Sequence, residues 1–309
     1  MSSLQKSVGT GTGLADAPPP IYIDARRNLA EHFLFGRGLE IGPLHQPLHL
    51  PPHVTVRYVD RMKEDELREE YPELADWNLT PVDVVDDGET LSTIPAESQD
   101  FIVANHFLEH CENPIGTIET HFSKLRPGGL LFYAVPDKRF TFDSLRPLTP
   151  LEHMVADYEQ GPERSRAEHY AEWVRLVIDE GSGLAPTDPK YRSEEWEATK
   201  TKELEEESYS IHMHVWTQVE FLKLILECRR RLDIAFDIEA TARQGIEFMV
   251  VLRRQGAFPK PTPPPPPEPP PPPPPPPLSP EEIAVRNLLH LRVRRALGAA
   301  RREFRKTEA

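Results

Sequence analysis

Residues 38–48 read GLEIGPLHQPL, a short apolar strand followed by a loop with a single central glycine. In open α/β sheets, ligands bind outside the carboxyl ends of the strands, so this loop indicates what the domain binds. A dinucleotide requires three glycines and a helix N-terminus that faces its pyrophosphate. After Gly42 the chain has Pro43 and Pro47 in place of such glycines. The loop therefore predicts an α/β fold whose ligand carries no diphosphate.

Short apolar strands alternate with helical stretches around this loop. Strands are predicted at 38–41, 54–59, 81–85, 101–105 and 130–135, with two more at 233–240 and 246–252. Helices are predicted at 114–125 and 217–231, and a turn at 126–129 follows the first of them. The alternation predicts a parallel sheet with helices on both faces, and the last two strands predict an antiparallel terminal hairpin at one edge.

Composition divides the chain into four segments. They are a flexible N-terminus (1–20), an α/β domain (21–256) with an inserted lid rich in Tyr, Trp and charges (137–210), a proline-rich linker (257–280) and an amphipathic C-terminal helix (281–309). The polyproline linker is a rod of about 3 Å per residue. The C-terminal helix has an apolar stripe and many arginines, which predicts docking on a partner protein or an anionic membrane surface. The alternative is a marginal helix in solvent.

Charge and cysteine usage exclude several classes of protein. The formal net charge is -14, with 50 acidic against 36 basic residues, so no nucleic-acid partner is expected. Neither a secretory signal nor an apolar stretch long enough to span a bilayer is recognisable, which predicts a cytoplasmic location. The two cysteines, Cys111 and Cys228, are predicted to be reduced core thiols.

Acidic residues follow the second and third predicted strands. Asp60 stands where a carboxylate accepts both hydroxyls of a ribose, and Asp86 and Asp87 stand where one accepts an exocyclic amine such as adenine N6. For each acid alone, a helix cap or a solvated loop charge is the alternative. Together they predict an adenosine without phosphates.

In their order and spacing these motifs resemble the class I S-adenosylmethionine-dependent methyltransferases. The resemblance covers roughly residues 30–145 and, more loosely, 210–254, through GLEIG, YVD, VVDDGETL, DFIVANHFLEH and KLRPGGLLFYAVPD. It departs at Leu44 and Gln46, where the family pattern has further glycines. It implies a Rossmann-like, seven-stranded, mostly parallel sheet and S-adenosylmethionine as cofactor. The domain at 21–256 would then be the methyltransferase domain.

The resemblance also implies cofactor-binding residues. These are Glu40 and Gly42 for the amino acid moiety, Asp60 for the ribose, Asp87 and Gly88 for the adenine, and Asn105 and His106 for the sulfonium side. An NAD-dependent oxidoreductase would share the ribose acid. It would also need the phosphate glycines and a Tyr–Lys proton-relay pair, which the chain lacks.

Methyl transfer to a hydroxyl requires a base, and histidine has a suitable pKa. The catalytic candidates are His110, which is the first choice, His153 and His169, whereas His212 and His214 are interpreted as ordinary strand positions. Some O-methyltransferases bind Mg²⁺ through Glu-x-x-Glu-His at this place. Because His106 replaces the first glutamate, no metal is predicted.

The predicted lid contains five basic residues, which are Lys138, Arg139, Arg146, Arg164 and Arg166. They are interpreted mainly as partners of neighbouring carboxylates, and unpaired ones would favour an acceptor with carboxylate or phosphate groups. The aromatic residues among them suit sugar rings. The sequence therefore predicts O-methylation of a small-molecule or glycan acceptor. The alternative is a catalytically weak cofactor-binding module that acts as a scaffold in a larger assembly.

Overall fold

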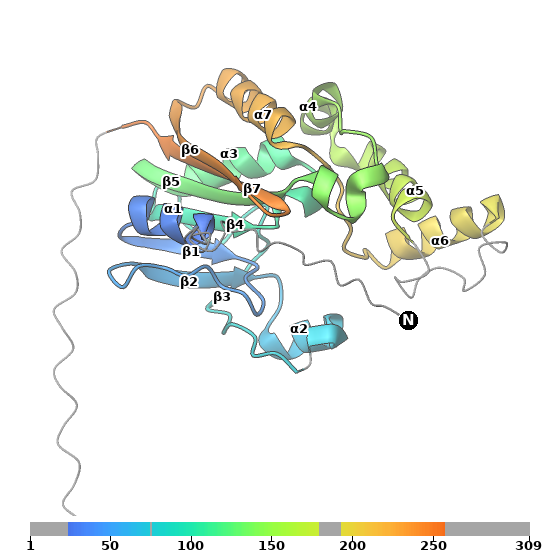
Figure 1. Cartoon of the computed structure of the whole chain (residues 1–309), viewed down its shortest axis with the longest axis horizontal. Coiled ribbons are helices and arrows are strands. Elements are labelled where there is room, and N and C mark those ends of the chain that lie inside the picture. The colour runs from blue at the N-terminus through green and yellow to red at the C-terminus, as the bar shows by residue number, and fades with distance from the viewer. Residues whose placement is uncertain (1–23, 75, 179–192, 257–309) are drawn as a thin grey trace, which may run out of the picture. The chain divides into compact units, whose positions relative to one another are not determined.

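Seven strands form one sheet in the order β3-β2-β1-β4-β5-β7-β6 (Figure 1). The structure is a computed structural model that describes residues 24–74, 76–178 and 193–256. The strands are β1 (Arg37–Ile41), β2 (Thr55–Asp60), β3 (Val84–Val85), β4 (Gln99–Asn105), β5 (Leu125–Pro136), β6 (Phe236–Gln244) and β7 (Glu247–Arg254). The first five pair in parallel, and β7 runs antiparallel to both β5 and β6. The predicted mostly parallel sheet with a terminal hairpin is confirmed.

Two boundaries differ from the prediction. The third strand was expected at 81–85, but only Val84 and Val85 pair with β2 as strand residues, although Asp83 N donates to Tyr58 O just before them. The turn expected at 126–129 lies inside β5 as an irregularity, where pairing moves from Gln99–Leu125 to Phe101–Leu130. Gly128 provides the left-handed conformation there, with φ of 82°.

The helices are α1 (Ala25–Phe33), α2 (Glu64–Glu70), α3 (Pro114–Lys124), α4 (Leu151–Gln160), α5 (Arg166–Leu176), α6 (Glu194–Glu206) and α7 (Gln218–Arg231). One face of the sheet is covered by α3, α4 and α7, whose apolar residues recur every three or four positions. Helix α3 begins where the Asn113 side chain accepts a hydrogen bond from Gly116 N and Pro114 occupies the first turn.

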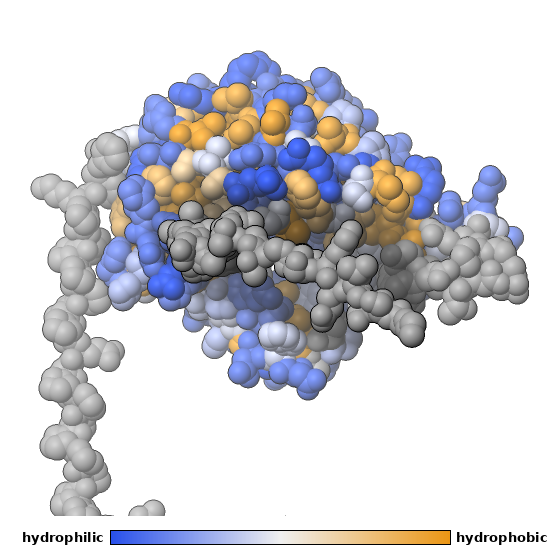
Figure 2. All heavy atoms as spheres, in the orientation of Figure 1, coloured by the Kyte–Doolittle hydropathy of each residue, from blue (hydrophilic) through white to orange (hydrophobic). Residues whose placement is uncertain are grey.

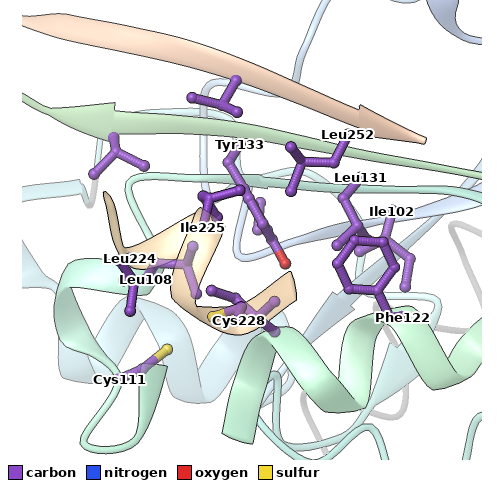
Figure 3. Close-up of a cluster of buried hydrophobic side chains, with 14 of the residues drawn as sticks. Ile102, Leu108, Cys111, Phe122, Leu131, Tyr133, Leu224, Ile225, Cys228 and Leu252 are labelled. Carbon is purple, nitrogen blue, oxygen red and sulfur yellow. The ribbon is translucent and has the colours of Figure 1, made fainter. Parts of the chain in front are cut away.

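Figure 3 shows side chains of α3 and α7 meeting those of the central strands in the larger core. Cys111 and Cys228 are buried there as free thiols, as predicted. Tyr133 of β5 places a hydroxyl group in this core, and the hydroxyl oxygen lies 2.8 Å from Nδ1 of His121 on α3. A core hydroxyl without such a partner would cost about 1–3 kcal/mol.

The other face of the sheet is covered differently. Helix α1 packs there through Ala30, together with Leu34, which follows the helix, and Leu48 from the loop after β1. That loop, residues 42–54, contains no helix, so β1 and β2 are joined by a non-helical crossover. Helices therefore lie on both faces, and the described loop after β1 contains no helix whose N-terminus could face a phosphate.

The inserted segment 137–210 contains α4, α5 and α6, where described, and its role as a lid stays a prediction. The predicted flexible N-terminus (1–20), the linker (257–280) and the C-terminal helix (281–309) lie outside the described residues. Figure 2 shows hydrophobic residues scattered among hydrophilic ones on the viewed face. None of the described helices is long and apolar enough to cross a membrane.

Candidate active site

The strand register brings three predicted site residues side by side. Near the strand ends, Ile41 pairs with Val59 on one side and with Ala104 on the other, so the next residues, Gly42, Asp60 and Asn105, follow at neighbouring positions. A hydrogen bond of 2.9 Å from Gly42 N to Val59 O continues this alignment past the strand. The carboxyl ends of β1, β2 and β4 therefore form one edge with an acid, a glycine and an amide.

Glu40 is a buried carboxylic acid at this edge. Its Oε1 accepts hydrogen bonds from Leu48 N at 2.8 Å and from Asn105 Nδ2 at 3.4 Å. Its Oε2 and the Oδ1 of Asn105 are buried and make no hydrogen bond to any described residue. Burial raises the pKa of Glu40 to about 7. A cationic group next to Oε2 would stabilise the ionised form, so the site is suited to an ammonium or a sulfonium.

Two glycines shape the site. Gly42 has φ of 60°, and a Cβ atom placed on it would meet no atom within 4 Å. At Gly88 a Cβ atom would lie 2.6 Å from Phe107 and 2.7 Å from Ile41, so only glycine fits. The carbonyl oxygen of Gly88 lies 2.8 Å from His121 Nε2. Burial lowers the pKa of His121 to about 4, so the neutral ring donates to Gly88 and accepts from the Tyr133 hydroxyl.

The acids after β2 and β3 have different partners. Asp60 is largely buried, and its Oδ1 accepts from Arg61 N at 2.8 Å, while burial raises its pKa. Asp86 holds its own loop together through hydrogen bonds from the backbone and hydroxyls of Ser92 and Thr93. Asp87 is exposed and uses only Oδ1 within the loop. Asp86 is therefore structural, and Asp87 keeps an oxygen for a ligand.

His106 is held by two carboxylates that the sequence did not associate with it. Its Nε2 lies 2.7 Å from Glu247 Oε2, and its Nδ1 lies 3.5 Å from Glu109 Oε1. Glu247, at the start of β7, also pairs with Arg26 of α1. His106 has φ of 49°, a strained conformation for this residue type. Its ring is fixed in place, and sequence spacing gave no signal for Glu247, which is 141 residues away.

A first histidine group consists of Glu109, His110 and His212, whose ligand-type atoms lie within 4.8 Å of one another. The rings of His110 and His212 meet edge to face, with centroids 4.8 Å apart. His110 Nδ1 lies 2.9 Å from the carbonyl oxygen of Ile211, and burial lowers the pKa of His110 to about 3. Burial raises the pKa of Glu109, whose two carboxylate oxygens make no hydrogen bond to a described residue.

His212, which the sequence suggested was an ordinary strand residue, is oriented by a carboxylate. Its Nδ1 lies 2.7 Å from Asp143 Oδ2. Burial opposes ionisation of Asp143, but the hydrogen bond from His212 and the charge of Arg146 outweigh it and lower the pKa of Asp143. The ionised acid accepts this hydrogen bond, so Nδ1 of His212 is the donor and Nε2 is the ring nitrogen that remains for an acceptor hydroxyl.

The other two predicted bases belong to a second histidine group. His153 and His169 lie with their Nε2 atoms 3.0 Å apart, beside Asp157 and His214. Burial lowers the pKa of His169 to about 4 and that of His214 well below its usual value. The structure thus separates His110 from His153 and His169. Sequence spacing alone predicts neither group, because each includes a histidine from the segment at 211–216.

Three of the five basic residues in the predicted lid pair with neighbouring carboxylates, as the sequence predicted for most of them, and the other two bond to neutral groups. Arg139 pairs with Asp137, Arg146 with Asp143 and Glu172, and Arg166 with Glu112. Lys138 donates to the carbonyl oxygen of Ser144, and Arg164 bonds to the side chain of Gln160. These contacts leave little support for an acceptor that carries carboxylate or phosphate groups.

The residues present fit S-adenosylmethionine. The unpartnered Oε2 of Glu40 suits its ammonium group, Gly42 leaves room for close approach, and Asp60 follows at the neighbouring strand end. In the described loop after β1, no helix N-terminus is present to bind a diphosphate, which disfavours a dinucleotide.

Comparisons with known proteins give one family match and several structural likenesses. Residues 8–177 match a family model described as a methyltransferase domain. The chain is similar to the CurJ carbon methyltransferase (14% identity, TM-score 0.35, 72% of this chain and 49% of that chain). It is also similar to a SAM-dependent methyltransferase from Aquifex aeolicus, with 11% identity and a TM-score of 0.37 over 73% of this chain and 84% of that chain. A SAM-dependent methyltransferase from Methanosarcina mazei has 16% identity and a TM-score of 0.37 over 72% of this chain and 95% of that chain. It spans about half the length of the CurJ chain. No curated protein matches the sequence.

Proposed function

Because this chain belongs to the methyltransferase-domain family, we propose that it methylates a hydroxyl oxygen of a sugar, a glycan or a related small metabolite. The protein is a methyltransferase, and its cofactor is S-adenosylmethionine. Bound S-adenosylmethionine supplies an electrophilic methyl group on a sulfonium, which an acceptor oxygen displaces in line. The chain itself has to position the acceptor, exclude water and take up a proton.

The proposed cofactor contacts follow the strand ends. Glu40 and Gly42 bind the amino acid moiety, Asp60 binds the ribose, and Asp87 with Gly88 binds the adenine. Asn105 and His106 line the sulfonium side. The support is the alignment of β1, β2 and β4 together with the unpartnered oxygens of Glu40 and Asn105.

The main support for O-methylation is the hydrogen bond between Asp143 and His212, which belongs to the first histidine group. His212 Nε2 takes the proton of the acceptor hydroxyl, and the Asp143 carboxylate stabilises the resulting imidazolium. His110, the base predicted from sequence, lies beside it, but its pKa of about 3 disfavours protonation. We therefore place His212 ahead of His110 as the base and retain His110 as its ring neighbour.

The surroundings of His212 favour a neutral ring-shaped acceptor. Phe142 is 58% exposed, and its ring centroid lies 4.8 Å from that of His212. Phe140 is also exposed and carries the guanidinium groups of Arg139 and Arg243 over its ring. The exposed Phe142 ring beside His212 suits the apolar face of a sugar, whereas Arg139, which is paired with Asp137, offers little to an anion.

The test combines cofactor binding with an acceptor screen. Calorimetry should show S-adenosylmethionine binding that Asp60→Ala weakens by at least about tenfold, equivalent to ~1.4 kcal/mol. Methyl-release assays over pools of neutral sugars, glycans, amines and acids should give product with neutral hydroxyl compounds, and mass spectrometry should locate the methyl group on oxygen.

Variants of the base complete the test. His212→Gln should lower kcat by about 10²-fold or more with little change in cofactor affinity. His49→Gln, at an exposed histidine in the loop after β1, is the matched control and should keep wild-type kcat. Methylation of nitrogen or carbon, or an unchanged kcat in His212→Gln, would refute O-methylation with His212 as base. Absence of any cofactor binding would instead favour the scaffold alternative.

A further inference from the structure

We propose that the chain contains a tetrahedral zinc site, separate from the proposed base, whose four ligands are His153, Asp157, His169 and His214. Three elements of the fold supply them. His153 and Asp157 are four residues apart on α4 and therefore share a face. His169 comes from α5, and His214 comes from the extended segment 211–216 that precedes α7. Ligand-type atoms of all four residues lie within 4.8 Å of one another.

The spacing of these atoms fits a four-coordinate metal. His153 Nε2 lies 3.0 Å from His169 Nε2 and 3.2 Å from Asp157 Oδ2, and His214 Nε2 lies 4.0 Å from that same oxygen. With Zn–N and Zn–O bonds near 2.0–2.1 Å, the ligand atoms of a tetrahedron stand about 3.3 Å apart. The three distances bracket this value, so small side-chain movements complete the coordination.

Polar atoms of the group lack other partners. Asp157 is 1% exposed, and its Oδ2 accepts no hydrogen bond from a described residue. His214 is fully buried, and its Nδ1 is likewise without a hydrogen bond among the described residues. A buried carboxylate oxygen in this condition costs several kcal/mol unless a cation compensates it. A divalent metal between the carboxylate and the imidazoles removes that cost.

Neighbouring groups fix the ligands in the manner of an outer shell. The Ser165 hydroxyl donates a buried hydrogen bond of 2.6 Å to Asp157 Oδ1, which leaves Oδ2 directed to the histidines. His214 Nε2 also has a long contact of 3.4 Å to the carbonyl oxygen of Glu112, which it gives up when it binds the metal. The rings of His169 and His214 meet at 80°, so they approach the centre from different directions. A hydroxyl that donates to a coordinating carboxylate, as Ser165 does here, orients metal ligands in proteins.

The donor set selects the metal. Three imidazole nitrogens and one carboxylate oxygen in a tetrahedral arrangement suit Zn²⁺, whereas Mg²⁺ requires six oxygen donors. Because all four positions come from the chain, the site is closed and structural. It fastens α4 and α5 of the inserted segment onto the segment that carries His212.

Metal analysis of the purified full-length protein tests this site. Elemental mass spectrometry should find about one zinc per chain, and Asp157→Asn and His169→Gln should each reduce it to below ~0.2. Glu152→Gln, at an acid on the same helix outside the ligand set, is the matched control and should keep the zinc. His110→Gln distinguishes the two histidine groups, and it should also keep the zinc.

A second measurement does not depend on the variants folding. Chelator-treated wild-type protein should melt several degrees lower and regain its stability with Zn²⁺ but not with Mg²⁺. Amides of α4 and α5 should exchange faster after chelation, while those of α1 stay unchanged. Co²⁺ in place of zinc should show the strong visible absorption of tetrahedral cobalt. Zinc-free protein that neither binds nor is stabilised by Zn²⁺, or zinc lost only in His110→Gln, would overturn the proposal.

Discussion

The substitution Gly42→Ala should affect cofactor binding and protein stability by amounts that can be measured separately. Gly42 has φ of 60°, so alanine there adopts a left-handed conformation at a cost of about 1–2 kcal/mol. The added Cβ atom meets no atom of the chain within 4 Å, so no clash increases this cost. The free energy of unfolding should therefore fall by only about 1–2 kcal/mol, as urea denaturation would measure.

Cofactor affinity should fall by a further, separate amount. The Cβ atom would occupy open space at the strand edge where the cofactor's amino acid moiety is proposed to bind and to contact the unpartnered Oε2 of Glu40. Displacing the ligand from that oxygen removes a charge-assisted contact of about 1.5–3 kcal/mol, which is a loss of at least about tenfold in affinity. Isothermal titration with S-adenosylmethionine and its demethylated product measures the change.

The chain offers a matched control in Gly245→Ala. Gly245 lies in the β6–β7 hairpin with φ of 57°, and its Cβ atom would also meet nothing within 4 Å. The backbone cost is thus the same, but β4, β5 and β7 separate this hairpin turn from β1 in the sheet. Equal cofactor affinity in Gly42→Ala and Gly245→Ala would refute the placement of the cofactor beside Gly42.

Three other substitutions have distinct expected outcomes. Burial raises the pKa of Glu40 to about 7, and the ionised form is the one proposed to bind the ammonium group. Cofactor affinity measured by calorimetry should therefore fall as the pH drops below about 7. The Glu40→Gln variant should not show this pH dependence. His121→Phe should lower the free energy of unfolding by about 1–3 kcal/mol in urea, since it leaves the Tyr133 hydroxyl unpaired, whereas an unchanged value would mean that water replaces the ring. Asp143→Asn should cost about 3–5 kcal/mol at pH 7 because Arg146 loses a buried partner. The lowered pKa of Asp143 contributes stability that is present above its ordinary value of 3.8 and is lost at lower pH, so wild type and variant should converge in acid.

The sequence predicted those features that depend on neighbouring residues. Strand ends are local, so the positions of Gly42, Asp60 and Asn105 followed from alternation and from the family resemblance. The prolines after Gly42 argued against a ligand with a diphosphate, and S-adenosylmethionine carries none. The short β3 was overestimated because apolar content at 81–85 does not reveal how many residues reach the neighbouring strand.

Contacts between distant residues were not predictable from spacing. His106 meets Glu247 across 141 residues, and His212 meets Asp143 across 69 residues. The second histidine group likewise combines α4, α5 and the segment at 211–216, so sequence spacing did not associate His153 and His169 with His214.

The segment at 211–216 links the two histidine groups through alternate residues. His212 faces His110 and Asp143, while His214 faces His169 and Asp157. His212 and His214 are two residues apart, so the two groups share a short stretch of backbone. Glu109 fixes the segment between them, because its carbonyl oxygen accepts hydrogen bonds from Met213 N at 2.7 Å and His214 N at 3.2 Å. A metal on His214 would therefore restrain His212 through the backbone without taking part in proton transfer.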